Sequence, residues 1–176
     1  MKGETLIVCS ETYSKYFNKF NRSISTIFSD CASVFLYQKN LKLIDHISGY
    51  EKNSHSSLIG YNRKEMNMDG GKVFNFVIST VVPSLEKFVK KKNIKKINKI
   101  YIHQASKIVI EIFKQKFSNY KFIFPSNLTK VGNTNASTIP LMLEEDVNKK
   151  KIKKGDRVIM CGFGVGLSFS IALIEI

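Results

Sequence analysis

The chain has few cysteines and no long hydrophobic run, and each lack excludes a class of protein. Cys9, Cys31 and Cys161 form no CxxC pair, and with the three histidines they give no spacing typical of a zinc site. We therefore expect reduced thiols that pack as small core residues, and no metal site. No apolar run approaches the roughly 18 residues of a membrane-spanning helix. Residues 6–9 are too short a run for a signal peptide, so the expected location is the cytoplasm, with no membrane partner.

Acidic residues are also scarce. The 176 residues include 14 Asp and Glu against 28 Lys and Arg, a formal net charge of +14. Such a field attracts acidic partners, which include nucleic acid, an anionic membrane and an acidic carrier protein. Lysines at helix ends and turns are usually just solvated, however. Nucleic acid is the least favoured partner, because the sequence contains no recognised nucleic-acid-binding module.

Apolar periodicity predicts strands that alternate with helices, and hence an α/β layered fold. Strands are expected at residues 5–9, 26–37, 41–48, 97–103, 122–124, 157–161 and 168–176, and helices from residue 72, at 104–117 and after residue 138. Pro83 should bend or interrupt the first helix, because it lacks a backbone donor. In the last helix we expect two pairs one turn apart, Glu145 with Lys149 and Asp146 with Lys150. Residues 50–71 are polar and indicate a long loop.

His103 stands where an apolar strand ends and a helix begins, a place where open α/β sheets present functional groups. A neutral imidazole there can donate a hydrogen bond or shuttle a proton near pH 7. Asn133 lies in the string GNTNASTIP, residues 132–140, and its amide offers two donors and an acceptor. Taken alone, the histidine indicates only a bond to a nearby carbonyl, and Gly-Asn is ordinary turn chemistry.

A glycine-rich segment, residues 162–166, follows the strand at 157–161. Glycine lets the backbone approach a ligand closely, so the N–H groups of this segment can form part of an oxyanion hole. A dinucleotide fingerprint needs a helix after its glycines. Residues 168–174 alternate as a strand, which excludes that interpretation. The remaining alternative is a glycine hairpin without a ligand, and the strands on either side are expected to be antiparallel neighbours.

These three features, in this order, resemble the C-terminal half of a type III ketoacyl-[acyl-carrier-protein] synthase, a thiolase-fold condensing enzyme. The sequence MDGGKVF at 68–74 is similar to the family's lead into the first helix of that half, and FSDCA at 28–32 is similar to its FGDGA strand. The resemblance implies an α/β, thiolase-like layered fold. Residues 1–40 would be the last strands of the N-terminal half, and residues 41–176 the C-terminal half-domain.

The resemblance also implies a decarboxylative Claisen condensation that serves fatty acid biosynthesis. An acyl group passes from coenzyme A to a cysteine, and malonyl-carrier protein loses carbon dioxide to give the attacking enolate. By matching, His103 and Asn133 would contact the malonyl thioester oxygen. The loop residues Gly164, Val165 and Gly166 would hold the acyl thioester oxygen, and Gln104, Ser106 and Lys107 would contact coenzyme A or the carrier protein. The coenzyme A thioester is then a substrate, and no bound cofactor is expected.

Three departures from the family pattern bear on activity. The family's nucleophilic cysteine lies upstream of the strand at 5–9, and no residue of this chain takes its place. Ser106 stands where the family has Asn, and Ile108 where it has a carrier-contacting Arg. We therefore expect the chain alone to be inactive and to need a partner, either an N-terminal half chain or a second copy of itself, besides acyl carrier protein and acyl-CoA. The alternative is a catalytically inert remnant or binding subunit.

Overall fold

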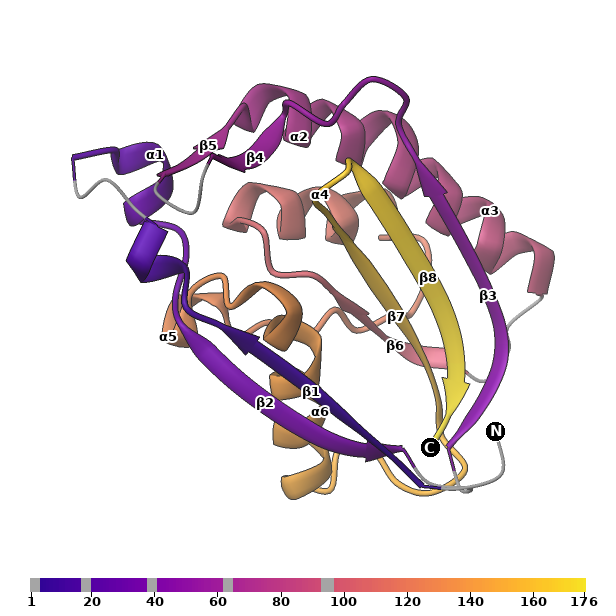
Figure 1. The fold of residues 1–176 in the computed structure, drawn as a ribbon. Coiled ribbons are helices and arrows are strands. Elements are labelled where there is room, and N and C mark those ends of the chain that lie inside the picture. Colours follow the sequence, from indigo (N-terminus) through magenta and orange to yellow (C-terminus); the bar gives the residue numbers. More distant parts are fainter. Residues whose placement is uncertain (1–3, 17–19, 38–40, 62–64, 93–96) are drawn as a thin grey trace.

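A computed structural model describes residues 4–16, 20–37, 41–61, 65–92 and 97–176 and confirms the α/β layered arrangement (Figure 1). Its main sheet has the strand order β3-β8-β7-β6. These strands are β3 (Lys42–Tyr50), β6 (Ile97–Ile102), β7 (Arg157–Gly164) and β8 (Ser168–Glu175). β8 is antiparallel to both β3 and β7, as expected for the last two strands, whereas β6 and β7 are parallel. The carboxyl ends of β6 and β7 therefore meet at one edge of the sheet.

Helices cover both faces of this sheet because its strands carry apolar side chains on both sides. One apolar cluster joins the sheet to α2 (Gly70–Phe76), a π-helical segment (Val77–Val81), α3 (Val82–Lys92) and α4 (Lys107–Lys116). A second, smaller cluster packs α6 (Thr138–Asn148) on the opposite face. The π-helical segment lies directly before Pro83, where the sequence predicts an interruption of the helix.

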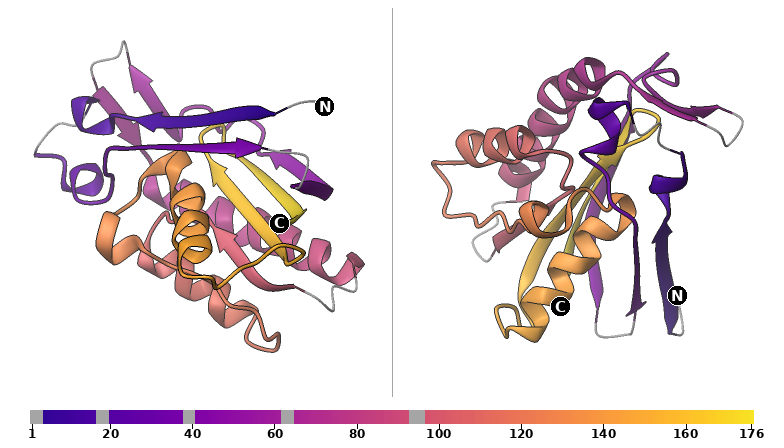
Figure 2. Two further views of the ribbon diagram at one scale, coloured as in Figure 1. Left: turned by 90° about the horizontal axis from the view of Figure 1, so that it is seen from below. Right: turned by 90° about the vertical axis from the view of Figure 1, so that its left-hand side faces the viewer.

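A separate two-stranded ribbon forms the outermost layer, on the far side of α6 (Figure 2, right). It pairs β1 (Thr5–Glu11) with β2 (Cys31–Tyr37) in antiparallel register. On its outer face Leu6 lies opposite Leu36, and Val8 lies opposite Val34. These four side chains are 42–62% exposed. The described part of the chain thus leaves an apolar strip of the ribbon uncovered.

Two expectations for the N-terminal part of the chain are wrong. The strand predicted at 26–37 begins only at Cys31, because α1 (Arg22–Ser25) and a turn precede it, and the backbone beside Phe28 pairs with Asn133 instead. The predicted loop at 50–71 contains an antiparallel pair of strands, β4 (Leu58–Tyr61) and β5 (Glu65–Met68). Each of these strands has only four residues, and the segments around them are polar, so neither gives a strong periodic signal. Residues 62–64 of that stretch lie outside the described residues.

Smaller differences occur farther along the chain. The helix predicted at 104–117 begins at Lys107, since Ser106 caps it by accepting a hydrogen bond from the Val109 N–H. The strand predicted at 122–124 is a single bridge between Ile123 and Lys99. The short helix α5 (Leu128–Val131) then leads to Gly132. Of the three cysteines expected in the core, only Cys161 is fully buried, and Cys9 and Cys31 are half-buried.

Of the two pairs predicted along α6, Glu145 with Lys149 is confirmed as an ion pair, and Asp146 with Lys150 is wrong. Asp146 is buried between α6 and β6, where its carboxylate accepts hydrogen bonds from Lys99 Nζ at 2.8 Å and from the Tyr101 hydroxyl at 2.7 Å. The Lys99 and Asp146 side chains are only 6% and 8% exposed, so the pair is shielded from water. Helical spacing predicted a neighbour on the next turn, but a strand packed across the helix supplies the partners.

Candidate functional site

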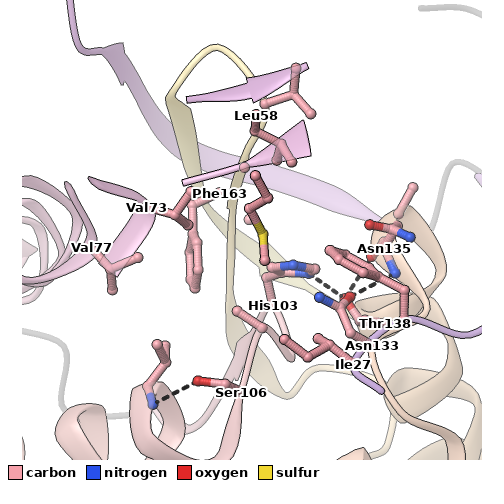
Figure 3. A pocket seen from close by; sticks show the side chains of 18 of the residues that line it. Ile27, Leu58, Val73, Val77, His103, Ser106, Asn133, Asn135, Thr138 and Phe163 are labelled. Atoms are coloured by element: carbon pink, nitrogen blue, oxygen red, sulfur yellow. Dashed lines mark hydrogen bonds between the residues drawn. The ribbon is translucent and has the colours of Figure 1, made fainter. Parts of the chain in front are cut away.

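A cavity of about 420 Å³ opens where the carboxyl ends of β6 and β7 meet the loop before α6 (Figure 3). Apolar side chains from α2, α4, β7 and the β4–β5 pair make up most of its wall. Its polar lining residues are Glu11, Tyr13, His103, Ser106, Asn133, Asn135 and Thr138. Few polar groups in an apolar cavity are typical of a small-molecule or substrate site.

His103 directly follows β6, and its backbone N–H bonds the Cys161 carbonyl of β7. The imidazole Nδ1 lies 2.9 Å from the Thr138 hydroxyl, at the start of α6. The ring meets Phe163 edge-on, with centroids 5.2 Å apart. Burial lowers the pKa of His103 to about 4, although the Asn135 carbonyl acts in the opposite direction. The imidazole is therefore neutral at pH 7 and can act without a buried charge.

Asn133 is held by its backbone on both sides. Its N–H donates to the Ile27 carbonyl at 3.0 Å, and its carbonyl accepts from the Ser29 N–H at 2.8 Å. Its side-chain Oδ1 accepts from the Asn135 N–H at 2.9 Å. Within the described residues the amide nitrogen makes no recorded hydrogen bond, so it is available to a ligand in the cavity.

Gly132 allows the Asn133 loop to lie close to residues 27–29. Its φ is +71°, and a Cβ at this position would lie 2.4 Å from the Ser29 hydroxyl oxygen. A side chain is excluded by both the conformation and the contact. Two further contacts hold the same loop to the ribbon: Ser137 Oγ lies 3.0 Å from Ser33 Oγ and 3.4 Å from the Cys9 carbonyl. The β1–β2 ribbon and the turn before it therefore position the Asn133 loop.

The structure thus brings together His103 and Asn133, which line one cavity and point toward each other in Figure 3. They are well separated in the sequence, and the alignment of β6 with the loop before α6 makes them neighbours. This proximity was the central spatial expectation from the sequence. Their catalytic role stays a prediction.

The loop expected at residues 162–166 is shorter in the structure. Residues 162–164 complete β7, and only residues 165–167 form the turn to β8. Gly164 and Val165 line the cavity, whereas Gly166 does not. The Val165 N–H has no recorded backbone acceptor within the described residues, so it remains a candidate donor to a ligand.

The three residues predicted to contact coenzyme A or a carrier protein lie in different environments. Ser106 lines the cavity at the start of α4, and Lys107 is exposed outside it. Gln104 is fully buried, donates to the Ile102 carbonyl and accepts from the Ser126 hydroxyl. We assign Gln104 a structural role, because it presents no surface to a docking protein.

Sequence reasoning missed several polar groups of the site. Thr138, Glu11 and Tyr13 line the cavity but were not predicted as site residues. Helical and strand periodicity gives no signal for such cross-element contacts. In the described part of the chain, no group of three or more His, Cys, Asp and Glu side chains is arranged to hold a metal ion. Among the described helices, none is long and apolar enough to span a bilayer.

The pKa of His103 gives a test on the isolated chain. An unfolded histidine has a pKa of about 6.5, so folding holds this side chain neutral where the unfolded chain would protonate it. The stability that this contributes is complete above pH 6.5 and should be lost as the pH falls toward 4. In His103→Gln this part of the pH dependence should disappear in urea unfolding measured from pH 7 to 4. An unchanged profile would show that folding does not lower the pKa of His103.

Solved structures with the same arrangement are synthases of the thiolase-like fold. A 2.1 Å crystal structure of a 3-oxoacyl-(acyl-carrier-protein) synthase III matches 98% of this chain with a TM-score of 0.86 and 23% identity, over 60% of its own length. The Thermus thermophilus beta-ketoacyl-[acyl carrier protein] synthase III matches 98% of the chain with a TM-score of 0.86 and 22% identity, over 59% of its length. At this identity the likeness defines the fold.

Sequence comparison defines the family. Residues 61–176 match the family model described as 3-oxoacyl-[acyl-carrier-protein (ACP)] synthase III C terminal. The beta-ketoacyl-[acyl-carrier-protein] synthase III of Clostridium perfringens strain SM101 is 30% identical over 97% of this chain and 59% of its own length. The chain therefore belongs to the beta-ketoacyl-[acyl-carrier-protein] synthase III family and covers its C-terminal part. It spans about three fifths of the length of these relatives.

Proposed function

We propose that this chain supplies the C-terminal half of a 3-oxoacyl-[acyl-carrier-protein] synthase III active site, which condenses an acyl thioester with malonyl-carrier protein. The observation that carries the proposal is the convergence of a neutral imidazole and a free carboxamide nitrogen in an apolar cavity. Such donors stabilise the negative charge that develops on a thioester oxygen. Membership of the synthase III family supports this choice of reaction and of acyl carrier protein and acyl-CoA as substrates.

In this proposal the Asn133 amide nitrogen and His103 Nε2–H both donate to the malonyl thioester oxygen. An Nε2–H tautomer requires a donor at Nδ1, and the Thr138 hydroxyl is 2.9 Å away. That hydroxyl also lies 2.9 Å from the Asn135 carbonyl, which already receives the Thr138 backbone N–H. In the proposed state the Thr138 hydroxyl donates its proton to Nδ1 of His103. A different donor, the backbone N–H of Val165, binds the acyl thioester oxygen.

In this proposal the nucleophile is supplied by residues that this sequence does not include, since none of Cys9, Cys31 and Cys161 lines the cavity. Burial raises the pKa of the Cys161 thiol to about 12, so it does not supply a thiolate near neutral pH. The unmatched two fifths of the relatives' length is the natural source of a reactive cysteine, either as a separate chain or as sequence continuous with this one. We place the completed enzyme in the cytoplasm.

We expect the chain alone to associate, because the strip Leu6, Val8, Val34 and Leu36 exposes contiguous apolar surface. Size-exclusion chromatography with light scattering should show dimers or larger species, and Leu6→Lys combined with Val34→Lys should shift them toward monomer. A monomeric wild-type chain with cooperative unfolding would contradict a need for a partner.

The proposed function is tested by completing the site. The chain is mixed or co-expressed with the part of the Clostridium perfringens synthase III that it does not span. Acetyl-CoA and malonyl-carrier protein are then supplied, and β-ketoacyl-carrier protein is measured by mass spectrometry. Product from the mixture, and none from either part alone, supports the proposal.

An inert remnant or binding subunit is the second candidate. It is favoured by one observation, that Ile108 is 65% exposed at the position where the family's carrier-contacting Arg is expected. A stable mixture that forms no product and does not bind malonyl-carrier protein would favour this candidate.

A further inference from the structure

The turn between β7 and β8 is fastened by a serine from a distant part of the chain. Ser54 follows β3 and is 7% exposed. Its hydroxyl oxygen accepts a hydrogen bond from the Leu167 N–H at 2.6 Å and lies 2.7 Å from the Gly166 carbonyl. It also lies 2.6 Å from the Glu51 carbonyl. One hydroxyl therefore contacts both polar groups of the Gly166–Leu167 peptide bond, the Gly166 carbonyl and the Leu167 N–H.

A second contact fixes the same two segments together. The Glu51 N–H donates to the Leu167 carbonyl at 2.9 Å. Residues 51–54, which lie much earlier in the sequence, thus bind three consecutive backbone groups of the turn: the Gly166 carbonyl, the Leu167 N–H and the Leu167 carbonyl. Buried backbone groups that lose such partners are costly to leave unpaired, so these bonds restrict the turn to one conformation.

The position of this turn matters because of Val165. Its N–H precedes the fastened peptide by one residue, and Val165 lines the cavity that holds His103 and Asn133. Val165 itself is 60% exposed, so its own side chain contributes little to holding the backbone. A donor to a developing oxyanion must be fixed in advance, because small misplacements reduce its contribution to the rate.

We propose that Ser54 is a positioning residue that holds the β7–β8 turn so that the Val165 N–H faces the substrate oxygen. This inference rests on the proposed condensation for its chemical role, but the fastening of the turn does not depend on it. The Ser54 hydroxyl acts only through the backbone and does not itself touch substrate.

Hydrogen–deuterium exchange of the completed complex tests the fastening directly. In Ser54→Ala, peptides that contain Leu167 should exchange at least about tenfold faster, while peptides from β6 stay unchanged. Ser54→Thr, which keeps the hydroxyl, should retain slow exchange. Ser170→Ala is the matched control, since Ser170 is an exposed serine of β8 that lies opposite Gly162, away from the turn.

Kinetics tests the functional part. In an active complex Ser54→Ala should lower kcat about tenfold and leave KM for malonyl-carrier protein unchanged, because the lost donor acts on the developing charge. Unchanged exchange at Leu167, equal acceleration in β6, or local acceleration without a change in kcat would each overturn the proposal. If the wild-type complex is inactive, the proposed function fails, while the exchange result still decides whether Ser54 holds the turn.

Discussion

Replacing His103 with alanine is expected to slow condensation by about a hundredfold or more in the completed enzyme, as the loss of one oxyanion donor does elsewhere. The imidazole is neutral, because burial lowers its pKa to about 4, and it lies at the wall of the cavity beside Asn133. Its N–H can therefore stabilise the enolate oxygen without the cost of burying a charge. The measurement is the rate of β-ketoacyl-carrier protein formation at saturating malonyl-carrier protein.

His46→Ala is the matched control for this experiment. His46 is an exposed histidine of β3, outside the cavity lining, and its replacement should leave the rate unchanged. Asn133→Ala should reduce the rate to a similar degree as His103→Ala. The double replacement should cost less than the product of the two effects, because both donors serve one oxygen. A His103→Ala enzyme as active as the wild type would remove His103 from the mechanism.

Lys99→Met is expected to lower the free energy of unfolding by about 3–5 kcal/mol, the usual cost of breaking a buried ion pair. Lys99 Nζ lies 2.8 Å from the Asp146 carboxylate, and both side chains are buried. Without the lysine, the buried carboxylate keeps only the Tyr101 hydroxyl and the distant Lys151 as partners. Burial, followed by the Asp146 carboxylate, raises the pKa of Tyr101, so this hydroxyl stays protonated.

Urea unfolding of the two proteins measures this effect. Glu175→Gln is the control, because it removes an ion pair of similar geometry, Arg157 Nε to Glu175 at 2.8 Å, at a much more exposed place. We expect it to cost less than about 1 kcal/mol, as surface pairs usually do. Equal effects of Lys99→Met and Glu175→Gln would show that the pair at Asp146 is solvated in solution.

Much of the fold could be predicted from local patterns. The strands at β1, β3, β6, β7 and β8 and the helices α3, α4 and α6 follow from apolar periodicity, although β1 turns Leu6 and Val8 outward instead of into the core. The β4–β5 pair could not be predicted, because it lies in a polar stretch whose pairing depends on neighbours. The early start predicted for β2 failed for a related reason: residues 27–29 pair with Asn133, which is distant in the sequence.

The residues of the candidate site also fall into those that the sequence could identify and those that it could not. His103 and Asn133 were identifiable because their residue types, order and flanking motifs resemble the synthase III family. Ser54 and Thr138 were not, because a hydroxyl that supports a distant turn or an imidazole leaves no local pattern. Gln104, which the motif predicted to contact coenzyme A or the carrier protein, is buried.

The sequence by itself determined the class of fold and picked out His103 and Asn133 as candidate site residues, because side-chain chemistry and periodicity are local properties. Only the tertiary structure decided which groups hold those residues in place. The ribbon fixes the Asn133 loop, Thr138 contacts the imidazole, Ser54 binds the glycine turn, and Asp146 is buried against β6. Such contacts join segments that packing alone brings within hydrogen-bond distance.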